Sequence, residues 1–446
     1  MLEVFYYVVV ILSIVMYFIA IKFYKLRLFS FSTVSYVMAF FLAMLPGYKI
    51  SAGAFYNSAF THGFDLDIYI LYLFFSMLFP IAIIMGNIAG KNYYLYSEPR
   101  NHIDLRMKLT VVLIVVYSFA YFLWLPFIPI NSLLTGSANL GEVAIQRISI
   151  THQLAATSDN LPFLFRYWRN IIQNLFFIVF VYFIASNKID NKRSKIFLIM
   201  LFLLLAYNLT FTLEKASIIY AVAAIFFVNF MQVKKINFKN LVIAFSVLLL
   251  ISFSLIYFFM GGENVFDVVD AFIVRLTEQT CSVYLQIEYI RQYGHLLFRG
   301  IYMPLISHVV DPQYNIDLSR WAYANIFPLN ADIGMIGSAG GMAMAELYFL
   351  FSWFCLPIFL VVMLVYGWID SILINSVYAK NISIEMININ MAFYIYFMTV
   401  FSLALTGSVF GILSFPFIVS PEVFIIIMFY LLYTKVSSIS LRRCAS

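Results

Sequence analysis

Long apolar runs separated by short polar segments occupy almost the whole chain of 446 residues. Crossing the hydrocarbon core of a bilayer takes roughly 20 consecutive, mostly apolar residues in a helix. Eleven runs have about that length. We therefore expect membrane-spanning helices at residues 2–21, 31–50, 66–88, 109–130, 170–186, 196–213, 216–233, 240–260, 342–368, 391–411 and 413–434.

The composition supports this assignment. Hydrophobic residues make up 64% of the chain and charged residues 11%, whereas about a quarter of a soluble domain is charged. Eleven spans and their connections use up the sequence, which leaves no separate soluble domain. We expect an all-α polytopic integral membrane protein that forms one domain over residues 1–446.

Lysine and arginine are concentrated in alternate gaps between the expected spans, and these gaps hold 18 of the 27 basic residues. Cytoplasmic segments of membrane proteins carry such an excess, so we place these gaps in the cytoplasm, the N-terminus outside and the C-terminus inside. The net charge of +6 is then an orientation signal rather than a nucleic-acid footprint. The acids assigned to the same face are Glu98, Asp104, Asp190, Asp370 and Glu385.

Two long segments fall on the opposite, outer side, at residues 131–169 and 261–341. Connections of this length are usually functional. The spacing of apolar residues predicts a helix over 268–293 within the longer one. Charged residues here do not serve as cytoplasmic orientation signals, so they are candidates for chemistry.

Several kinds of chemistry are not indicated. The sequence has no P-loop, no dinucleotide-binding glycine pattern, no His-Glu-x-x-His and no Cys-x-x-Cys. We expect no cofactor and no metal site. A reaction would have to draw its energy from a substrate that is already activated.

Cations recur at helical spacing in the longer outer segment. Arg291, His295 and Arg299 follow one another every fourth residue, and three cations on one face suit a polyanion. Arg275 lies three residues before Glu278, and Glu288 lies three residues before Arg291. Both spacings fit an ordinary ion pair on a helix surface, which explains Glu288 with Arg291 at least as well as a functional role.

A glycine-rich stretch closes the same segment and follows Arg320. Exposed backbone amides that lead into a helix can bind phosphate, although a flexible turn back into the membrane is an equally good interpretation. Glu346 lies inside the next expected span, where an ionisable group indicates a function or a specific partner. The glycines are Gly334, Gly337, Gly340 and Gly341.

Further cations lie at the outer ends of other spans. Lys215 occupies a tight outer turn, LTFTLEKASIIYA, and Arg147 lies in the first outer segment. Arg166 and Arg169 are three residues apart in FRYWRN and share a helical face. Anchoring of basic and aromatic side chains at the membrane surface explains several of these positions nearly as well as ligand binding.

Three features together resemble the Wzy family of O-antigen polymerases. They are the turn LEKASIIYA, the long outer segment with its Arg and Pro residues, and the closing stretch GSAGGMAMAELYFLF. The resemblance covers most of the chain in layout and is specific in those short stretches. Some members carry an Arg followed ten residues later by Gly in both outer loops, and no outer-loop arginine here has that spacing.

The resemblance implies a membrane-embedded glycosyltransferase of GT-C-like architecture in the inner membrane of a bacterium, with both outer segments as periplasmic loops. Such an enzyme polymerises oligosaccharide repeat units linked to undecaprenyl pyrophosphate by inverting, metal-independent transfer, and so makes O-antigen for lipopolysaccharide or a related surface polysaccharide. A regulator of chain length is a partner by the same analogy.

Roles for the candidate residues follow from this chemistry. Cations would stabilise the charge that develops on the leaving pyrophosphate, and Glu278, His295 or His308 would serve as the base for the attacking hydroxyl. The residues do not decide among these three. The candidates for binding pyrophosphate or substrate are Arg147, Arg166, Arg169, Lys215, Arg275, Arg291, Arg299 and Arg320.

Two alternatives stay open. An O-antigen ligase uses the same lipid donor with a different acceptor, so only its product distinguishes it. A flippase for lipid-linked oligosaccharide belongs to another class and should carry charges along a central cavity through its spans. Here the candidate cations are concentrated in the outer segments.

Overall fold

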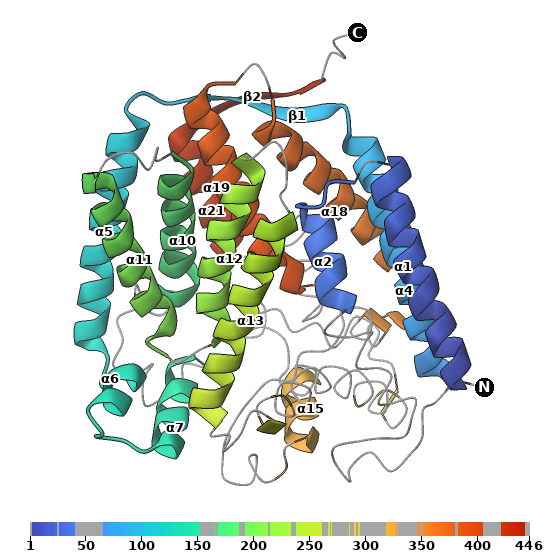
Figure 1. Cartoon of the computed structure of the whole chain (residues 1–446), viewed down its shortest axis with the longest axis horizontal. Coiled ribbons are helices and arrows are strands. Elements are labelled where there is room, and N and C mark those ends of the chain that lie inside the picture. The colour runs from blue at the N-terminus through green and yellow to red at the C-terminus, as the bar shows by residue number, and fades with distance from the viewer. Residues whose placement is uncertain are drawn as a thin grey trace.

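Helices dominate the computed structural model, and two strands accompany them (Figure 1). The structure describes residues 2–24, 26–40, 66–151, 168–186, 192–212, 215–232, 238–260, 318–326, 351–379, 382–404 and 421–441, with a few isolated positions between them. The long helices are α1 (Leu2–Tyr24), α4 (Leu66–Gly90), α5 (Ile103–Trp124), α10 (Trp168–Ser186), α11 (Lys192–Thr210), α12 (Lys215–Gln232), α13 (Phe238–Met260), α18 (Cys355–Val377) and α19 (Ile384–Ala404). The shorter elements are α2 (Phe31–Ala39), β1 (Tyr93–Pro99), α6 (Pro129–Leu134), α7 (Leu140–Thr151), α15 (Leu318–Ile326), the 3-10 turn η3 (Ser352–Phe354), α21 (Pro421–Tyr433) and β2 (Thr434–Leu441).

Each of the eleven segments expected to span a membrane overlaps one of these helices. In chain order they are α1, α2, α4, α5, α10, α11, α12, α13, α18, α19 and α21. Among the described residues, three helical stretches are long and apolar enough to cross a bilayer, namely Tyr6–Tyr24, Ile103–Trp124 and Ser352–Val377. The full number of eleven crossings stays a prediction.

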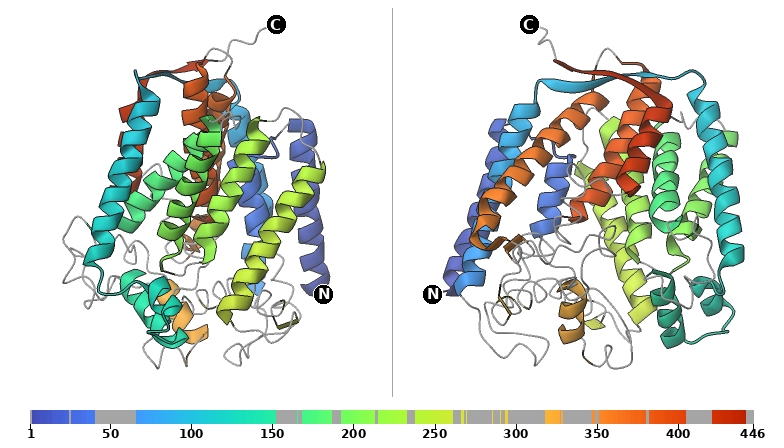
Figure 2. Two further views of the ribbon diagram at one scale, coloured as in Figure 1. Left: turned by 60° about the vertical axis from the view of Figure 1, so that its left-hand side comes forward. Right: turned by 180° about the vertical axis from the view of Figure 1, so that it is seen from behind.

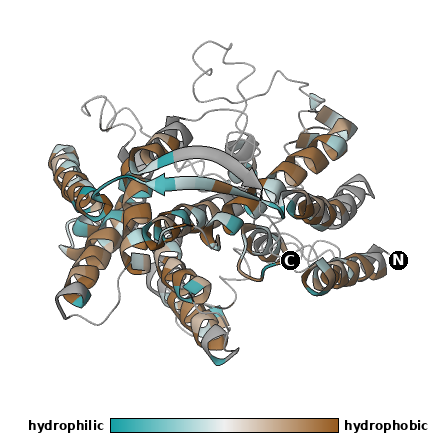
Figure 3. Ribbon diagram, turned by 90° about the horizontal axis from the view of Figure 1, so that it is seen from above, coloured by the Kyte–Doolittle hydropathy of each residue, from teal (hydrophilic) through white to brown (hydrophobic). Residues whose placement is uncertain are grey.

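Beyond its first two turns, helix α5 is apolar on all its faces. Its inward side buries Met107, Val111 and Ile114, while Leu113 and Leu123 on its outward side are 68% and 71% exposed. A helix that is hydrophobic all round belongs in a large core or in a membrane. Seen from above, the helices present predominantly hydrophobic residues to their surroundings (Figure 3), so this bundle suits a lipid environment.

The helices stand side by side, and the two strands cover one end of the bundle (Figures 1 and 2). We call this the sheet end. The opposite end holds α6, α7 and α15, and we call it the loop end. Strands β1 and β2 pair antiparallel, from Tyr93 opposite Leu441 to Pro99 opposite Thr434. The described chain is mostly helical, as expected for an all-α membrane protein, and this small sheet is a feature that the sequence analysis did not predict. Strand β1 is rich in the aromatic residues that favour strands.

Basic residues of the short gaps gather at the sheet end. Arg100 lies directly after β1, Lys435 lies within β2, and Arg106 and Lys108 lie in the first turns of α5, which begins there. The alternation of Lys and Arg along the chain therefore follows the alternation of the two ends of the bundle. Which side of a membrane each end faces stays a prediction.

Helices α4 and α18 pack at glycines. A Cβ atom added to Gly86 would collide with the carbonyl oxygen of Leu364, and one added to Gly367 would collide with the carbonyl oxygen of Ile83. A Cβ on Gly90 would lie 2.7 Å from the Cβ of Ser371. The sequence Gly86-x-x-x-Gly90 thus acts as a small-residue contact of the kind that brings membrane helices close together.

The boundaries of α18 correct the sequence analysis. The expected span was 342–368, whereas α18 (Cys355–Val377) ends at Val377; most of residues 342–350 lie outside the described part of the chain. Asp370 was assigned to a cytoplasmic gap, but it lies within the helix and is fully buried. Polar residues at the end of α18 face neighbouring elements of the protein, and for that reason they resembled a connecting segment in the sequence.

Candidate functional site

The structure describes some of the predicted site residues and not others. Arg166, Arg275, Glu278, Arg291, His295, Arg299 and His308 lie outside the described residues, as does most of the helix predicted over 268–293. Four candidates lie on described helices. Arg147 belongs to α7, Arg169 to the first turn of α10, Lys215 to the first turn of α12, and Arg320 to α15.

Local hydrogen bonds fix the two short helices of the loop end. Pro129 opens α6, where its missing N–H is not needed. Helix α7 starts with a reciprocal cap, in which the backbone N–H of Glu142 donates to the side chain of Asn139 at 2.9 Å and the N–H of Asn139 donates to the Glu142 carboxylate at 3.0 Å. This arrangement is a capping box. It sets the start of the helix that carries the partly buried Arg147.

A compact hydrophobic cluster holds the loop end together. Its buried members are Tyr121 and Leu125 from the end of α5, Ile150 from α7 and Phe211 from the end of α11. Ile172 of α10 packs against the same group. We call this set the loop-end cluster. The backbone N–H of Ile130 in α6 also donates to the carbonyl of Phe211 at 3.1 Å, which docks α6 onto α11.

The loop-end cluster brings three of the predicted cations into one region. Arg147 lies three residues from Ile150, Arg169 lies three residues from Ile172, and Lys215 follows four residues after Phe211. Arg147 and Arg169 are therefore about one helical turn from a residue of the cluster or packed on it, and Lys215 begins the helix that follows Phe211 in the chain. The first outer segment and the outer turn, which are separate in sequence, meet at one place.

Arg320 belongs to a separate part of the loop end. Its helix α15 is anchored by Ala322, which is fully buried, and by Trp321, which packs against the main core. Figure 1 places α15 at the same end of the bundle as α6 and α7. Four candidate cations on four helices therefore lie at the loop end.

Metal binding is not indicated in the described part of the chain. No three side chains of His, Cys, Asp or Glu gather there as they would around an ion.

Asp370 is the buried charge that the sequence analysis misplaced. Its carboxylate accepts hydrogen bonds from the backbone N–H groups of Phe31 and Ser32, each at 3.2 Å, from the hydroxyl of Ser32, and from the hydroxyl of Tyr394 at 2.6 Å. The two N–H groups belong to the first turn of α2, whose cap is Ser30. Asp370 therefore fixes the start of α2 against α18 and α19.

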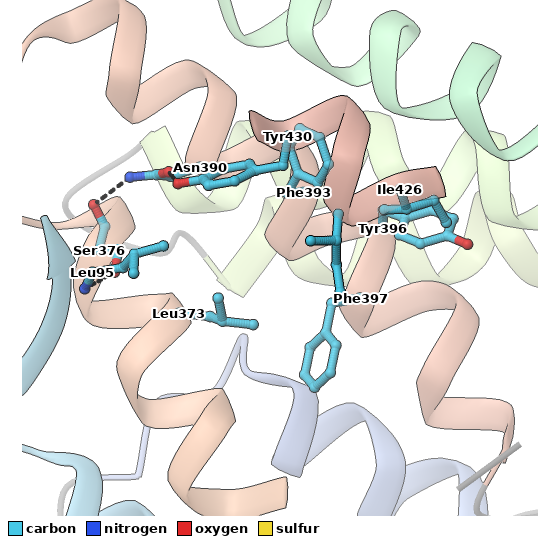
Figure 4. Close-up of a pocket in the computed structure, with 10 residues that line it drawn as sticks. Leu95, Leu373, Ser376, Asn390, Phe393, Tyr396, Phe397, Ile426 and Tyr430 are labelled. Carbon is cyan, nitrogen blue, oxygen red and sulfur yellow. Dashed lines mark hydrogen bonds between the residues drawn. The ribbon is translucent and has the colours of Figure 1, made fainter. Parts of the chain in front are cut away.

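An apolar cavity of about 170 Å³ lies near the sheet end between α18, α19, α21 and β1 (Figure 4). The polar residues at its edge are already paired. Tyr430 donates to the amide oxygen of Asn390 at 2.8 Å, and the Asn390 amide donates to the carbonyl of Ser376 at 3.2 Å. The remaining lining is mainly apolar, including Phe393 and Phe397. This cavity suits an apolar chain, and the described residues that line it include no charged group.

These features define a helical membrane protein. No known protein family, curated protein or solved structure matches the chain.

Proposed function

We propose that this protein is a membrane glycosyltransferase that polymerises oligosaccharide repeat units carried on undecaprenyl pyrophosphate, and that transfer takes place at the loop end. The observation that carries the proposal is the convergence of segments at the loop-end cluster. It gathers Arg147 with the first turns of α10 and α12, which hold Arg169 and Lys215.

The chemistry of the substrate accounts for such an arrangement. Transfer from a lipid pyrophosphate leaves a strongly anionic group, so the enzyme needs positioned cations more than a strong acid. A donor carried on a membrane lipid must also meet the protein at the membrane surface. Cations at the ends of the apolar helices would lie at a suitable depth for that encounter.

The proposal is tested with purified protein and a lipid-linked repeat unit, with the products separated on a gel. Wild type should give a ladder of glycan lengths. Arg147→Gln and Lys215→Gln should each slow ladder formation by about 10²-fold, the order found when one group that stabilises developing negative charge is removed. Lys108→Gln is the matched control, because Lys108 is an exposed lysine at the sheet end.

The two alternatives predict other products. A ligase would transfer one glycan to a lipid A-core acceptor and form no ladder with repeat units alone. A flippase would move the lipid-linked unit across a liposome bilayer without joining glycans. Either result with a competent substrate would replace the polymerase proposal.

A further inference from the structure

A second hollow of about 480 Å³ opens at the sheet end, at the edge of the bundle formed by α1, α4 and α18. Its lining combines two cations, Arg27 and Lys91, with the polar side chains of Ser30, Asn87 and Ser371. No Asp or Glu occurs among the described residues that line it. The hollow is therefore positively charged.

Both cations are positioned by residues from the end of α18. The guanidinium carbon of Arg27 lies 4.2 Å from the centre of the Tyr378 ring, a stacking contact. The Tyr378 hydroxyl donates to the carbonyl of Met231 at 3.2 Å, which holds the ring in place. The Asn375 amide donates to the carbonyl of Lys91 at 3.0 Å and so fixes the turn that carries the second cation.

The nearby buried carboxylate of Asp370 already accepts hydrogen bonds from other groups, so it is not an available partner for these cations. Asp370 precedes Ser371 of the lining, but Ser32, Tyr394 and the backbone of Phe31 already donate to it. The polar groups of α18 thus divide into two sets. Asp370 holds the start of α2 in place, whereas Ser371 and Asn375 line the hollow.

Part of the remaining lining is apolar and exposed. Phe23 of α1 and Ile88 of α4 are 69% and 47% exposed, and both line the hollow. The hollow thus has an apolar rim beside two cations, at the end of an apolar bundle. This combination suits a molecule with a phosphate headgroup and hydrocarbon tails. A small soluble anion would not use the exposed rim.

We propose that this hollow binds the headgroup of an anionic phospholipid, with its phosphate at Arg27 and Lys91 and its acyl chains along Phe23 and Ile88. The proposal does not depend on the glycosyltransferase activity. A lipid in this position would contact α1, α4 and α18 together and would add to the packing of that edge of the bundle.

The test measures how strongly the protein selects an anionic lipid. Purified full-length protein in phosphatidylcholine bilayers is mixed with spin-labelled phosphatidylglycerol or spin-labelled phosphatidylcholine, and the motionally restricted fraction of each label is measured. Wild type should prefer phosphatidylglycerol. The double variant Arg27→Gln with Lys91→Gln should lose that preference, by about fivefold for each cation removed.

Three variants keep the result interpretable. Exchange of the cations, Arg27→Lys with Lys91→Arg, should retain most of the preference. Lys108→Gln with Lys435→Gln removes two exposed charges from the same end but outside the hollow, and should leave the preference unchanged. If the double variant does not fold, Lys91→Gln alone changes an exposed side chain and should lower the preference about fivefold.

Three outcomes would overturn the proposal. Wild type could show no preference for phosphatidylglycerol. The control pair could lower the preference as much as the double variant, which would mean diffuse surface charge. Glycerol phosphate at millimolar concentration could displace the labelled lipid, which would assign the hollow to a soluble phosphate instead.

Discussion

At the scale of single residues, Asp370 is an acidic residue that the sequence pattern assigned to the wrong segment of the chain. In the sequence it follows an apolar run and looks like the first residue of a cytoplasmic gap. In the structure it is fully buried and accepts hydrogen bonds from two backbone N–H groups and two hydroxyls. A buried charge is tolerated when its hydrogen bonds are satisfied, and the donors to Asp370 come from segments more than twenty residues away in the chain.

Asp370→Asn should destabilise the protein by about 3 kcal/mol, because an NH₂ group would face donors that now require an acceptor. Tyr394→Phe removes one of the four donors and should cost about 1 kcal/mol. Thermal unfolding in one detergent measures both effects. Glu98→Gln, at an exposed position in β1, is the control and should change little. An Asp370→Asn protein as stable as wild type would mean that the carboxylate is not a structural acceptor.

At the scale of elements, the apolar pattern predicts where helices occur better than where they end. All eleven expected segments overlap helices, yet α18 continues to Val377, beyond the expected end at 368. The reason is that Asn375 and Ser376 are polar residues whose hydrogen-bond partners lie inside the protein. The sheet was not predictable from the sequence, because β1 and β2 pair with each other across a very long separation along the chain.

The contact between α4 and α18 gives a second prediction at this scale. Gly367→Leu should prevent close packing, because even a Cβ there collides with the backbone of Ile83. We expect a loss of about 3 kcal/mol or failure to fold, as for other overpacked sites. Ala89→Leu adds a side chain of the same size to the exposed face of α4 and should be neutral. Thermal unfolding compares the two, and equal stability of both variants would contradict the glycine contact.

At the scale of the whole molecule, the protein has two chemically different ends. The sequence predicted this division from the positions of Lys and Arg, because the distribution of charge between alternate gaps is visible without a structure. It also supplied the residue types of the candidate site. It did not predict that Ile150, Ile172 and Phe211 meet in one cluster, since contacts between helix ends depend on how distant segments pack.

The placement of the two ends in the membrane is the last prediction. Ser137→Cys lies between α6 and α7 at the loop end, and Lys435→Cys lies in β2 at the sheet end; both positions are exposed. Cys281 and Cys444 are first replaced by Ser, while Cys355 is retained because it is buried. In intact cells a membrane-impermeant maleimide should label the Ser137→Cys protein, and it should label the Lys435→Cys protein only after permeabilisation.

The opposite labelling pattern would place the basic gaps outside the cell. The proposed polymerase would then lose its support, because its candidate cations would face the cytoplasm, away from the compartment in which lipid-linked repeat units are joined according to the family resemblance. The lipid-binding hollow would move to the outer leaflet but would keep its cations and its rim. Labelling therefore tests the proposed function separately from the lipid site, whose own test depends only on Arg27 and Lys91.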